Sequence, residues 1–247
     1  MTKYLCGPFI LLAFGLTVLG LTTPGMAGTA PTSNSPIVVA CVGDSLTAEG
    51  SHGLPPPHMA YPDQLQGLLG PGYKVENFGH GGGTALKKGD FTYWKKKEYP
   101  RALASKANIV IIMLGTNDSK PQNWVHGDEF VADYRELIKS FQALDTHPRI
   151  YLCRIPTVIE PNKYKISEKV SVIIRQRIDD LGKELGLTVI PMDQAYGGDL
   201  SVLGTDHVHG DARGARELAQ TAAKVLTSTV PTPPQLLNTM PPSESQN

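Results

Sequence analysis

The chain of 247 residues carries 23 Lys and Arg against 23 Asp and Glu, so its formal net charge at pH 7 is zero. This balance argues against nucleic acid as a partner, because binding a phosphate backbone requires a strongly basic surface. The length suits one sizeable α/β domain, and nothing in the sequence predicts a second hydrophobic core.

The first 27 residues have the character of a secretory signal peptide. Lys3 is the only charge before a largely apolar stretch, residues 5–21, and Gly25-Met26-Ala27 offers the small side chains that signal peptidase reads. The alternative is a retained membrane anchor, because the apolar stretch is nearly long enough to span a bilayer. Pro24 and the small-residue site favour cleavage, so we expect a secreted or periplasmic mature chain with a net charge of about −1.

The remaining chain divides into a linker, a domain and a tail. A linker over 28–35 precedes the single domain expected over 36–227. From Ser228 the chain is rich in Pro, Ser and Thr, which neither continue a helix nor build a core. We therefore expect residues 228–247 to be disordered.

Two cysteines remain once Cys6 leaves with the signal segment. Cys41 and Cys153 both fall within predicted buried strands, where a free cysteine behaves as a small hydrophobic residue. A disulfide between them would require adjacent strands. We expect two free thiols.

The first strand of the domain lies in residues 37–50, IVVACVGDSLTAEG, and ends just before Ser45. Its apolar and β-branched residues indicate a strand buried on both faces, and Gly43 permits a tight turn after it. In open parallel sheets, ligands bind beyond the carboxyl ends of the strands, so Ser45 is a candidate nucleophile. By itself, Gly-Asp-Ser after a strand is more often an ordinary turn and helix cap.

A helix over 60–69 and a second strand over 73–78 lead to a glycine-rich turn at 79–84, GHGGGT. The bare backbone amides of such a turn either cradle an anion or merely permit a tight bend. The turn lacks the G-x-G-x-x-G spacing of a dinucleotide-binding loop.

Residues 87–97 hold five lysines together with Tyr93 and Trp94. We expect a solvated surface loop. The alternative is a rim that attracts a polar or acidic substrate, with Tyr93 or Trp94 stacking on it.

The strongest strand signal is Asn108–Leu114, and Gly-Thr-Asn117-Asp118 follows it directly. Asn117 or Asp118 could simply cap the next turn, a role compatible with a functional one. Later helices and strands are predicted in alternation, at 127–144, 149–153, 166–185, 187–190 and 212–226. Strands that alternate with helices predict a five-stranded parallel sheet covered on both faces.

The last motif is Asp206-His207-Val208-His209. An acid and a histidine three residues apart in a helical turn lie close enough for the carboxylate to hold the imidazole. The competing interpretation is a metal site built on Asp206, His207 and His209, although no other ligand cluster stands out to complete the coordination sphere.

Ser45, Gly82 and Asn117 follow successive strands, and the Asp206–His209 segment follows the last one, so all should converge on one edge of the sheet. Acyl transfer requires this set of groups: a hydroxyl nucleophile, an imidazole base, a carboxylate that orients it, and donors aimed at the oxyanion.

The order of four sequence blocks resembles the GDSL/SGNH hydrolase superfamily. The blocks are GDSL at 43–46, N-x-G-x-G-G-x-T at 77–84, GTND at 115–118 and D-x-x-H at 206–209. The resemblance implies a flavodoxin-like three-layer α/β/α fold with Ser45 as nucleophile, His209 as base and Asp206 as its partner. It also implies an oxyanion hole made of the Ser45 amide, the Gly82 amide and the Asn117 side-chain amide.

The chain departs from the family pattern at two places. Gly81-Gly82 stands where members commonly have Ser-Gly, and His209-Gly210-Asp211 stands where they often have His-Pro-Asn. Neither change removes a catalytic atom, and Asp211 can still cap the final helix. The segments LKKGDFTYWK and NDSKPQNW are similar to the sialate O-acetylesterase-like branch and related carbohydrate esterases.

These observations predict a secreted serine esterase that removes short acyl groups, most of all acetyl, from carbohydrate hydroxyls through an acyl-enzyme. Asp44, Tyr93 and Trp94 are candidates for contacts with substrate. We expect no cofactor, no metal, no nucleic acid partner and no membrane association of the mature chain. The alternatives are a lysophospholipase- or thioesterase-type lipid hydrolase and a non-catalytic carbohydrate-binding protein on the same fold.

Overall fold

The computed structural model describes residues 35–48 and 60–229, all of which belong to one compact unit. The predicted signal segment lies outside the described residues, as does the chain from 230 onwards. Among the described residues, none of the helices combines the length and apolar character needed to cross a bilayer.

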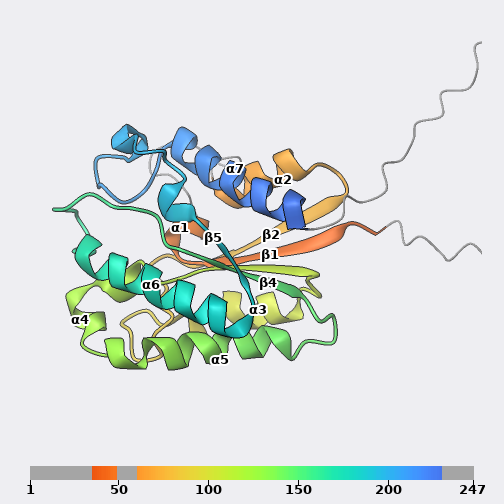
Figure 1. Ribbon diagram of the computed structural model, residues 1–247, viewed down its shortest axis with the longest axis horizontal. Coiled ribbons are helices and arrows are strands. Elements are labelled where there is room, and N and C mark those ends of the chain that lie inside the picture. Colours follow the sequence, from red (N-terminus) through yellow and green to blue (C-terminus); the bar gives the residue numbers. More distant parts are fainter. Residues whose placement is uncertain (1–34, 49–59, 230–247) are drawn as a thin grey trace, which may run out of the picture. The chain divides into compact units, whose positions relative to one another are not determined.

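Five parallel strands form a single sheet in the order β2-β1-β3-β4-β5 (Figure 1). The strands are β1 Ile37–Gly43, β2 Tyr73–Gly79, β3 Ile109–Met113, β4 Arg149–Cys153 and β5 Thr188–Ile190. This is the flavodoxin-like order, in which the chain reverses direction across the sheet between β1 and β3. The predicted five-stranded parallel sheet and α/β fold class are confirmed.

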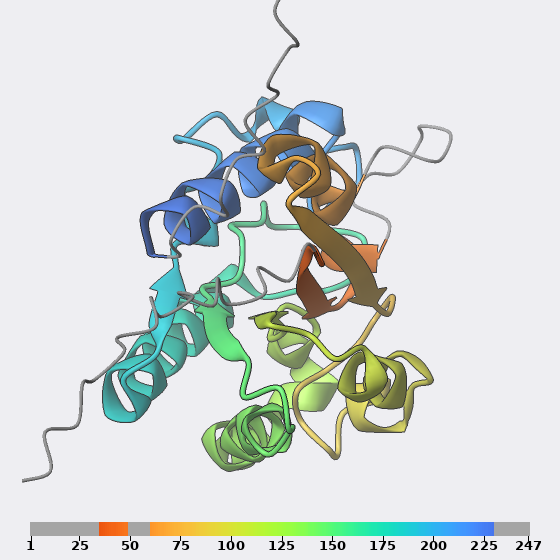
Figure 2. The ribbon, with the colours of Figure 1, turned by 90° about the vertical axis from the view of Figure 1, so that its right-hand side faces the viewer.

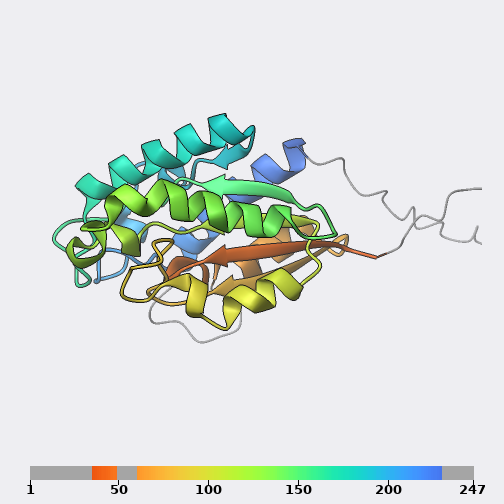
Figure 3. The same cartoon turned by 90° about the horizontal axis from the view of Figure 1, so that it is seen from below.

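Helices cover both faces of this sheet, as Figures 1 and 2 show. The helices are α1 Ser45–Ala48, α2 Tyr61–Leu69, α3 Glu98–Ala104, α4 Pro121–Trp124, α5 Phe130–Gln142, α6 Glu168–Leu185 and α7 Ala212–Thr229. Figure 3 shows α3, α5 and α6 over the same face.

Alternate residues of the central strands enter two separate cores. In β1, Val42 packs into the core on the α3, α5 and α6 side, whereas Val39 and Cys41 pack into the core beneath α1, α2 and α7. All five residues of β3 are buried. A parallel sheet covered on both faces explains why these strands appear in the sequence as continuous apolar runs.

The end of β1 is held against the end of β2 by hydrogen bonds that involve the glycine-rich block. The Asn77 side chain donates to the carbonyl oxygens of Thr47, at 2.8 Å, and Ala48, at 3.2 Å. The His80 amide donates to the Gly43 carbonyl at 2.9 Å. Short helix α1, which begins at Ser45, is therefore fixed to the neighbouring strand.

Helix α3, Glu98–Ala104, was not predicted from the sequence, and one expected boundary is wrong. The helix directly follows the lysine-rich segment and buries Glu98 and Ala102. The final helix continues through Ser228 to Thr229, so the predicted tail begins two residues too early. Thr229 is held there because its hydroxyl lies 2.6 Å from the Tyr151 hydroxyl.

Both described cysteines are free and buried, as predicted. Cys41 lies on β1 and Cys153 on β4, and β3 lies between these strands. Burial raises the pKa of the Cys41 thiol to about 12, so the thiol stays protonated at neutral pH.

We predict that Gly79→Ala destabilises the protein while Gly67→Ala does not. A β-carbon on Gly79 would lie 2.2 Å from the Ala48 backbone nitrogen, which cannot yield without moving α1, whereas one on Gly67 would meet nothing within 4 Å. Overpacking of this kind costs about 1–3 kcal/mol. Gly67→Ala, in the middle of α2, should instead increase the free energy of unfolding by about 0.5–1 kcal/mol.

Urea unfolding of both variants and the parent chain measures these differences. An unchanged free energy of unfolding for Gly79→Ala would contradict the tight contact between β2 and α1.

Candidate active site

The structure brings together Ser45, His209 and Asp206 in a continuous chain of hydrogen bonds. The His209 Nε2 atom lies 2.7 Å from Ser45 Oγ, and its Nδ1 atom lies 2.8 Å from Asp206 Oδ2. Ser45 comes from the start of α1, and the other two residues come from the turn before α7. Residues 164 positions apart in the sequence thus share a proton path.

The turn that carries His209 is built by the side chain of Asp206 and is not helical. Asp206 Oδ1 accepts hydrogen bonds from the backbone amides of Val208 and His209, each at 2.9 Å. Burial by itself raises the pKa of Asp206, but these two bonds and the contact with the His209 ring lower it below its usual value. A carboxylate at this position is therefore ionised at neutral pH.

An ionised Asp206 fixes the tautomer of the neutral imidazole. Since a carboxylate only accepts, His209 donates its Nδ1 proton to Asp206 and presents the Nε2 lone pair to the Ser45 hydroxyl. His209 is only 5% exposed, whereas Ser45 is partly exposed. This geometry can accept a proton from Ser45 and return it to a leaving group.

The predicted oxyanion donors lie on loops that are hydrogen-bonded to one another. The Asn117 side chain donates to the Gly83 carbonyl at 3.3 Å. Gly82 has φ +77°, a backbone conformation that favours glycine. The Ser45 amide lies at the start of α1.

Two buried carboxyl groups beside these loops were not assigned a positioning role from the sequence. Asp118 accepts hydrogen bonds from the amides of Ala85, at 3.1 Å, and Leu86, at 2.7 Å. Asp44 accepts one from the Leu46 amide at 3.0 Å. Both are fully buried, and this burial raises the pKa of Asp44 to about 6 and that of Asp118 to about 7.

Burial argues against substrate contact for Asp44 and Tyr93, two of the three residues expected in that role, whereas Trp94 is partly exposed. Asp44 and Tyr93 are fully buried, and the Tyr93 hydroxyl donates to the Phe78 carbonyl at 2.6 Å. The Trp94 ring packs against the core, and its Nε1 donates to the Ala85 carbonyl at 2.9 Å. These aromatic rings anchor the lysine-rich segment because their apolar surface is worth more in the core than at a rim.

Tyr164 is a neighbour of His209 that the sequence did not single out. Its ring lies edge to face with the imidazole, with centroids 5.4 Å apart at 88°, and its hydroxyl lies 3.5 Å from Asp206 Oδ2. Tyr164 belongs to the loop between β4 and α6, which begins at the carboxyl edge of the sheet. Because ligands bind beyond the carboxyl ends of parallel strands, the sequence could have indicated this loop as part of the site, but not one residue within it.

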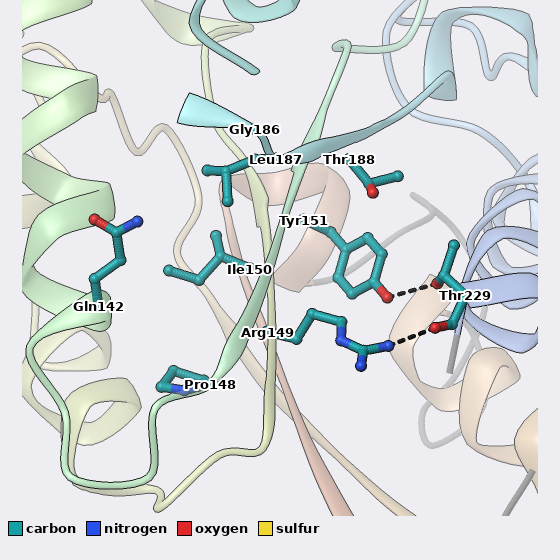
Figure 4. A pocket seen from close by; sticks show the side chains of 9 residues that line it. All are labelled: Gln142, Pro148, Arg149, Ile150, Tyr151, Gly186, Leu187, Thr188 and Thr229. Atoms are coloured by element: carbon teal, nitrogen blue, oxygen red, sulfur yellow. Dashed lines mark hydrogen bonds between the residues drawn. The ribbon is translucent and has the colours of Figure 1, made fainter. Parts of the chain in front are cut away.

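A cavity of about 380 Å³ lies at the opposite edge of the sheet, where β4 and β5 begin (Figure 4). Arg149, Leu187 and Thr229 are among the residues that line it, and none of the predicted site residues is. In the described part of the chain, no group of three or more His, Cys, Asp and Glu side chains is arranged to hold a metal ion.

The raised pKa of Asp118 predicts that stability falls as pH rises. In the unfolded chain this carboxyl loses its proton near pH 4, whereas in the folded chain it keeps the proton until about pH 7. The folded state therefore binds more protons between these values, and its stability decreases across them. Asp118→Asn removes the titrating group, so we expect a smaller decrease in the variant.

Denaturant unfolding at pH 4.5, 6.0 and 7.5 measures the slope of the free energy of unfolding against pH. Asp128→Asn, at an exposed position, is the matched control. The prediction concerns the slope and not the absolute stability, because asparagine cannot accept both backbone hydrogen bonds. Identical slopes in Asp118→Asn and the parent chain would contradict it.

Comparison with solved structures identifies the same fold in known esterases. A carbohydrate acetylesterase from Sinorhizobium meliloti superimposes with a TM-score of 0.64 at 21% identity, covering 78% of this chain and 99% of that one. An aryl esterase from M. smegmatis superimposes with a TM-score of 0.62 at 18% identity, with the same coverage of 78% and 99%. At these identities the likeness establishes the fold, which is the predicted SGNH hydrolase fold.

Sequence comparison identifies the family. An acetylxylan esterase from Xylanibacter ruminicola is 34% identical over 210 residues, which are 77% of this chain but 43% of that protein. The chain thus spans less than half the length of this relative. The model of the GDSL-like Lipase/Acylhydrolase family matches residues 41–217, a range that includes all four sequence blocks. The chain therefore belongs to the GDSL-like lipase/acylhydrolase family, a family of ester-hydrolysing enzymes.

Proposed function

We propose that this protein is an exported serine esterase that removes acetyl groups from carbohydrate hydroxyls. The observation that carries the proposal is the pair of contacts made by His209, at 2.7 Å to the Ser45 hydroxyl and 2.8 Å to the Asp206 carboxylate. A nucleophile, a base and an orienting carboxylate in hydrogen-bond contact are the parts that acyl transfer requires.

In the proposed first half-reaction, Ser45 Oγ attacks the ester carbonyl carbon as His209 Nε2 takes the hydroxyl proton. The carbonyl oxygen becomes an oxyanion, which the Ser45 amide, the Gly82 amide and the Asn117 side chain stabilise. The tetrahedral intermediate then breaks its bond to the sugar oxygen. His209 gives its proton to that oxygen, so the alcohol leaves neutral and an acetyl-serine remains.

In the second half-reaction, water replaces the sugar. His209 takes a proton from the water as the water oxygen attacks the acetyl-serine carbonyl. Collapse of the second intermediate releases acetic acid and returns the proton to Ser45. The ionised Asp206 balances the positive charge of the imidazolium in both steps, because its pKa lies below the usual value.

The proposed substrate class rests on the relative named an acetylxylan esterase, which is 34% identical over 210 residues. Because this chain corresponds to 43% of that protein, the acetyl group and the carbohydrate are both part of the proposal. The sequence alternatives, a lipid or thioester hydrolase and a non-catalytic binder, become outcomes of the experiment below.

We predict that p-nitrophenyl acetate is hydrolysed and that rates fall steeply as the acyl chain lengthens to octanoate, since a pocket shaped for acetyl excludes longer chains. Ser45→Ala should lower the rate on the acetate ester by a factor on the order of 10³ or more. Ser228→Ala, on the exposed end of α7, serves as the matched serine control.

Each outcome of this experiment has one meaning. Full activity of a folded Ser45→Ala variant would overturn the proposed nucleophile. Faster hydrolysis of the octanoate ester would favour the lipid hydrolase. Sugar binding without turnover of any ester would favour the non-catalytic binder.

Export is a separate part of the proposal and rests on the composition of the first 27 residues, which lie outside the described residues. We predict that the chain, expressed with its own amino terminus in a secreting host, appears outside the cytoplasm with Gly28 as its first residue. Amino-terminal sequencing or intact-mass measurement tests this. A cell-associated product that retains Met1 would contradict it.

A further inference from the structure

Phe91 presents a half-exposed aromatic ring directly beside Gly82, a proposed oxyanion donor. The Phe91 side chain is 51% exposed, although burying such a ring would contribute about 1.5–3 kcal/mol. A β-carbon placed on Gly82 would lie 3.5 Å from Phe91 Cγ and 3.6 Å from Phe91 Cβ. The ring therefore lies where a side chain on Gly82 would contact it.

The backbone around Phe91 is fixed. The Thr84 amide donates to the Phe91 carbonyl at 3.3 Å, and the Tyr93 amide donates to the Thr84 carbonyl at 3.0 Å. On the other side, the Asp90 amide donates to Asn123 Oδ1 at 2.9 Å. The buried Tyr93 anchors the segment to the core. Phe91 is thus held in place by its neighbours and does not depend on burial of its own ring.

A cationic group accompanies the ring. Lys96 Nζ lies 4.9 Å from the Phe91 ring centroid, a distance typical of a cation–π contact. An aromatic surface next to an ammonium group offers both an apolar platform and hydrogen-bond donors. A sugar ring has the matching chemistry, because its C–H groups form apolar patches and its hydroxyls accept hydrogen bonds.

We propose that Phe91, with Lys96 beside it, is a subsite for a sugar ring of the carbohydrate whose acetyl ester is hydrolysed. This inference rests on the proposed function and adds a specificity-determining residue to it. The ring of Phe91 takes the role that the sequence assigned to Tyr93 or Trp94. Phe91 discriminates between substrates by contacting the leaving group and takes no part in the chemical steps.

The test compares two acetate esters that differ in the leaving alcohol. Acetylated xylo-oligosaccharides carry sugar rings, whereas ethyl acetate has an alcohol too small to reach the subsite, and a pH-stat follows both. For Phe91→Ala we expect KM for the oligosaccharide to rise about tenfold, equivalent to about 1.4 kcal/mol. The loss in kcat/KM should be at least fivefold larger for the oligosaccharide than for ethyl acetate.

Two further variants separate recognition by an aromatic ring from simple packing against Gly82. Phe91→Tyr keeps the ring and should retain the parent KM for the oligosaccharide. Phe91→Leu keeps apolar volume without the ring and should behave like Phe91→Ala. Leu68→Ala, which removes a side chain that is 45% exposed on α2, is the matched control and should leave both activities unchanged.

Equal losses on the two esters, or full oligosaccharide affinity in Phe91→Leu, would overturn the subsite. Thermal unfolding confirms that each variant is folded before its kinetics are compared. Failure of the proposed function is distinguishable, because it would appear as undiminished ester hydrolysis by Ser45→Ala, whatever the Phe91 variants do.

Discussion

The candidate active site depends on the parallel pairing of β1 with a strand on either side. Gly43 at the end of β1 is in register with Gly79 of β2 and with Met113 of β3. Because all three strands run in the same direction, their following loops leave the sheet at the same edge. Ser45, Gly82 and Asn117 are brought to that edge by backbone hydrogen bonds, and the order of strands makes it a switch point where ligands bind.

In the loops at this edge, carboxyl side chains take the place of water as hydrogen-bond acceptors for backbone amides. Asp118 holds the loop after β2 through two backbone amides, and Asp206 closes the turn that carries His209 in the same way. The two carboxyl groups differ in protonation for a physical reason. Asp118 is fully buried and its pKa is raised, whereas Asp206 lies beside an imidazole that favours its charged form. One is suited to holding a loop and the other to balancing a developing positive charge.

The glycine turn after β2 belongs to both the proposed oxyanion hole and the proposed sugar subsite. Gly82 is a proposed oxyanion donor, and the same residue borders the ring of Phe91. A side chain at Gly82 would meet that ring and would strain a backbone with φ +77°. The proposed acyl-transfer centre and the proposed sugar subsite therefore meet at one residue without a β-carbon, which lets a substrate approach both.

The sequence by itself determined the strands, the long helices, the order of the four blocks and hence the fold, because strand burial and helix periodicity are local patterns. It also named the residues of the candidate triad. It did not determine which aromatic ring of the lysine-rich segment faces the solvent. Tyr93, Trp94 and Phe91 are near neighbours with similar hydrophobicity, and only tertiary packing decided that the first two anchor the segment while Phe91 stays exposed. The positions of Tyr164 and Asp118 were likewise decided by loops meeting in space, since contacts between residues far apart in the chain leave no periodic trace in the sequence.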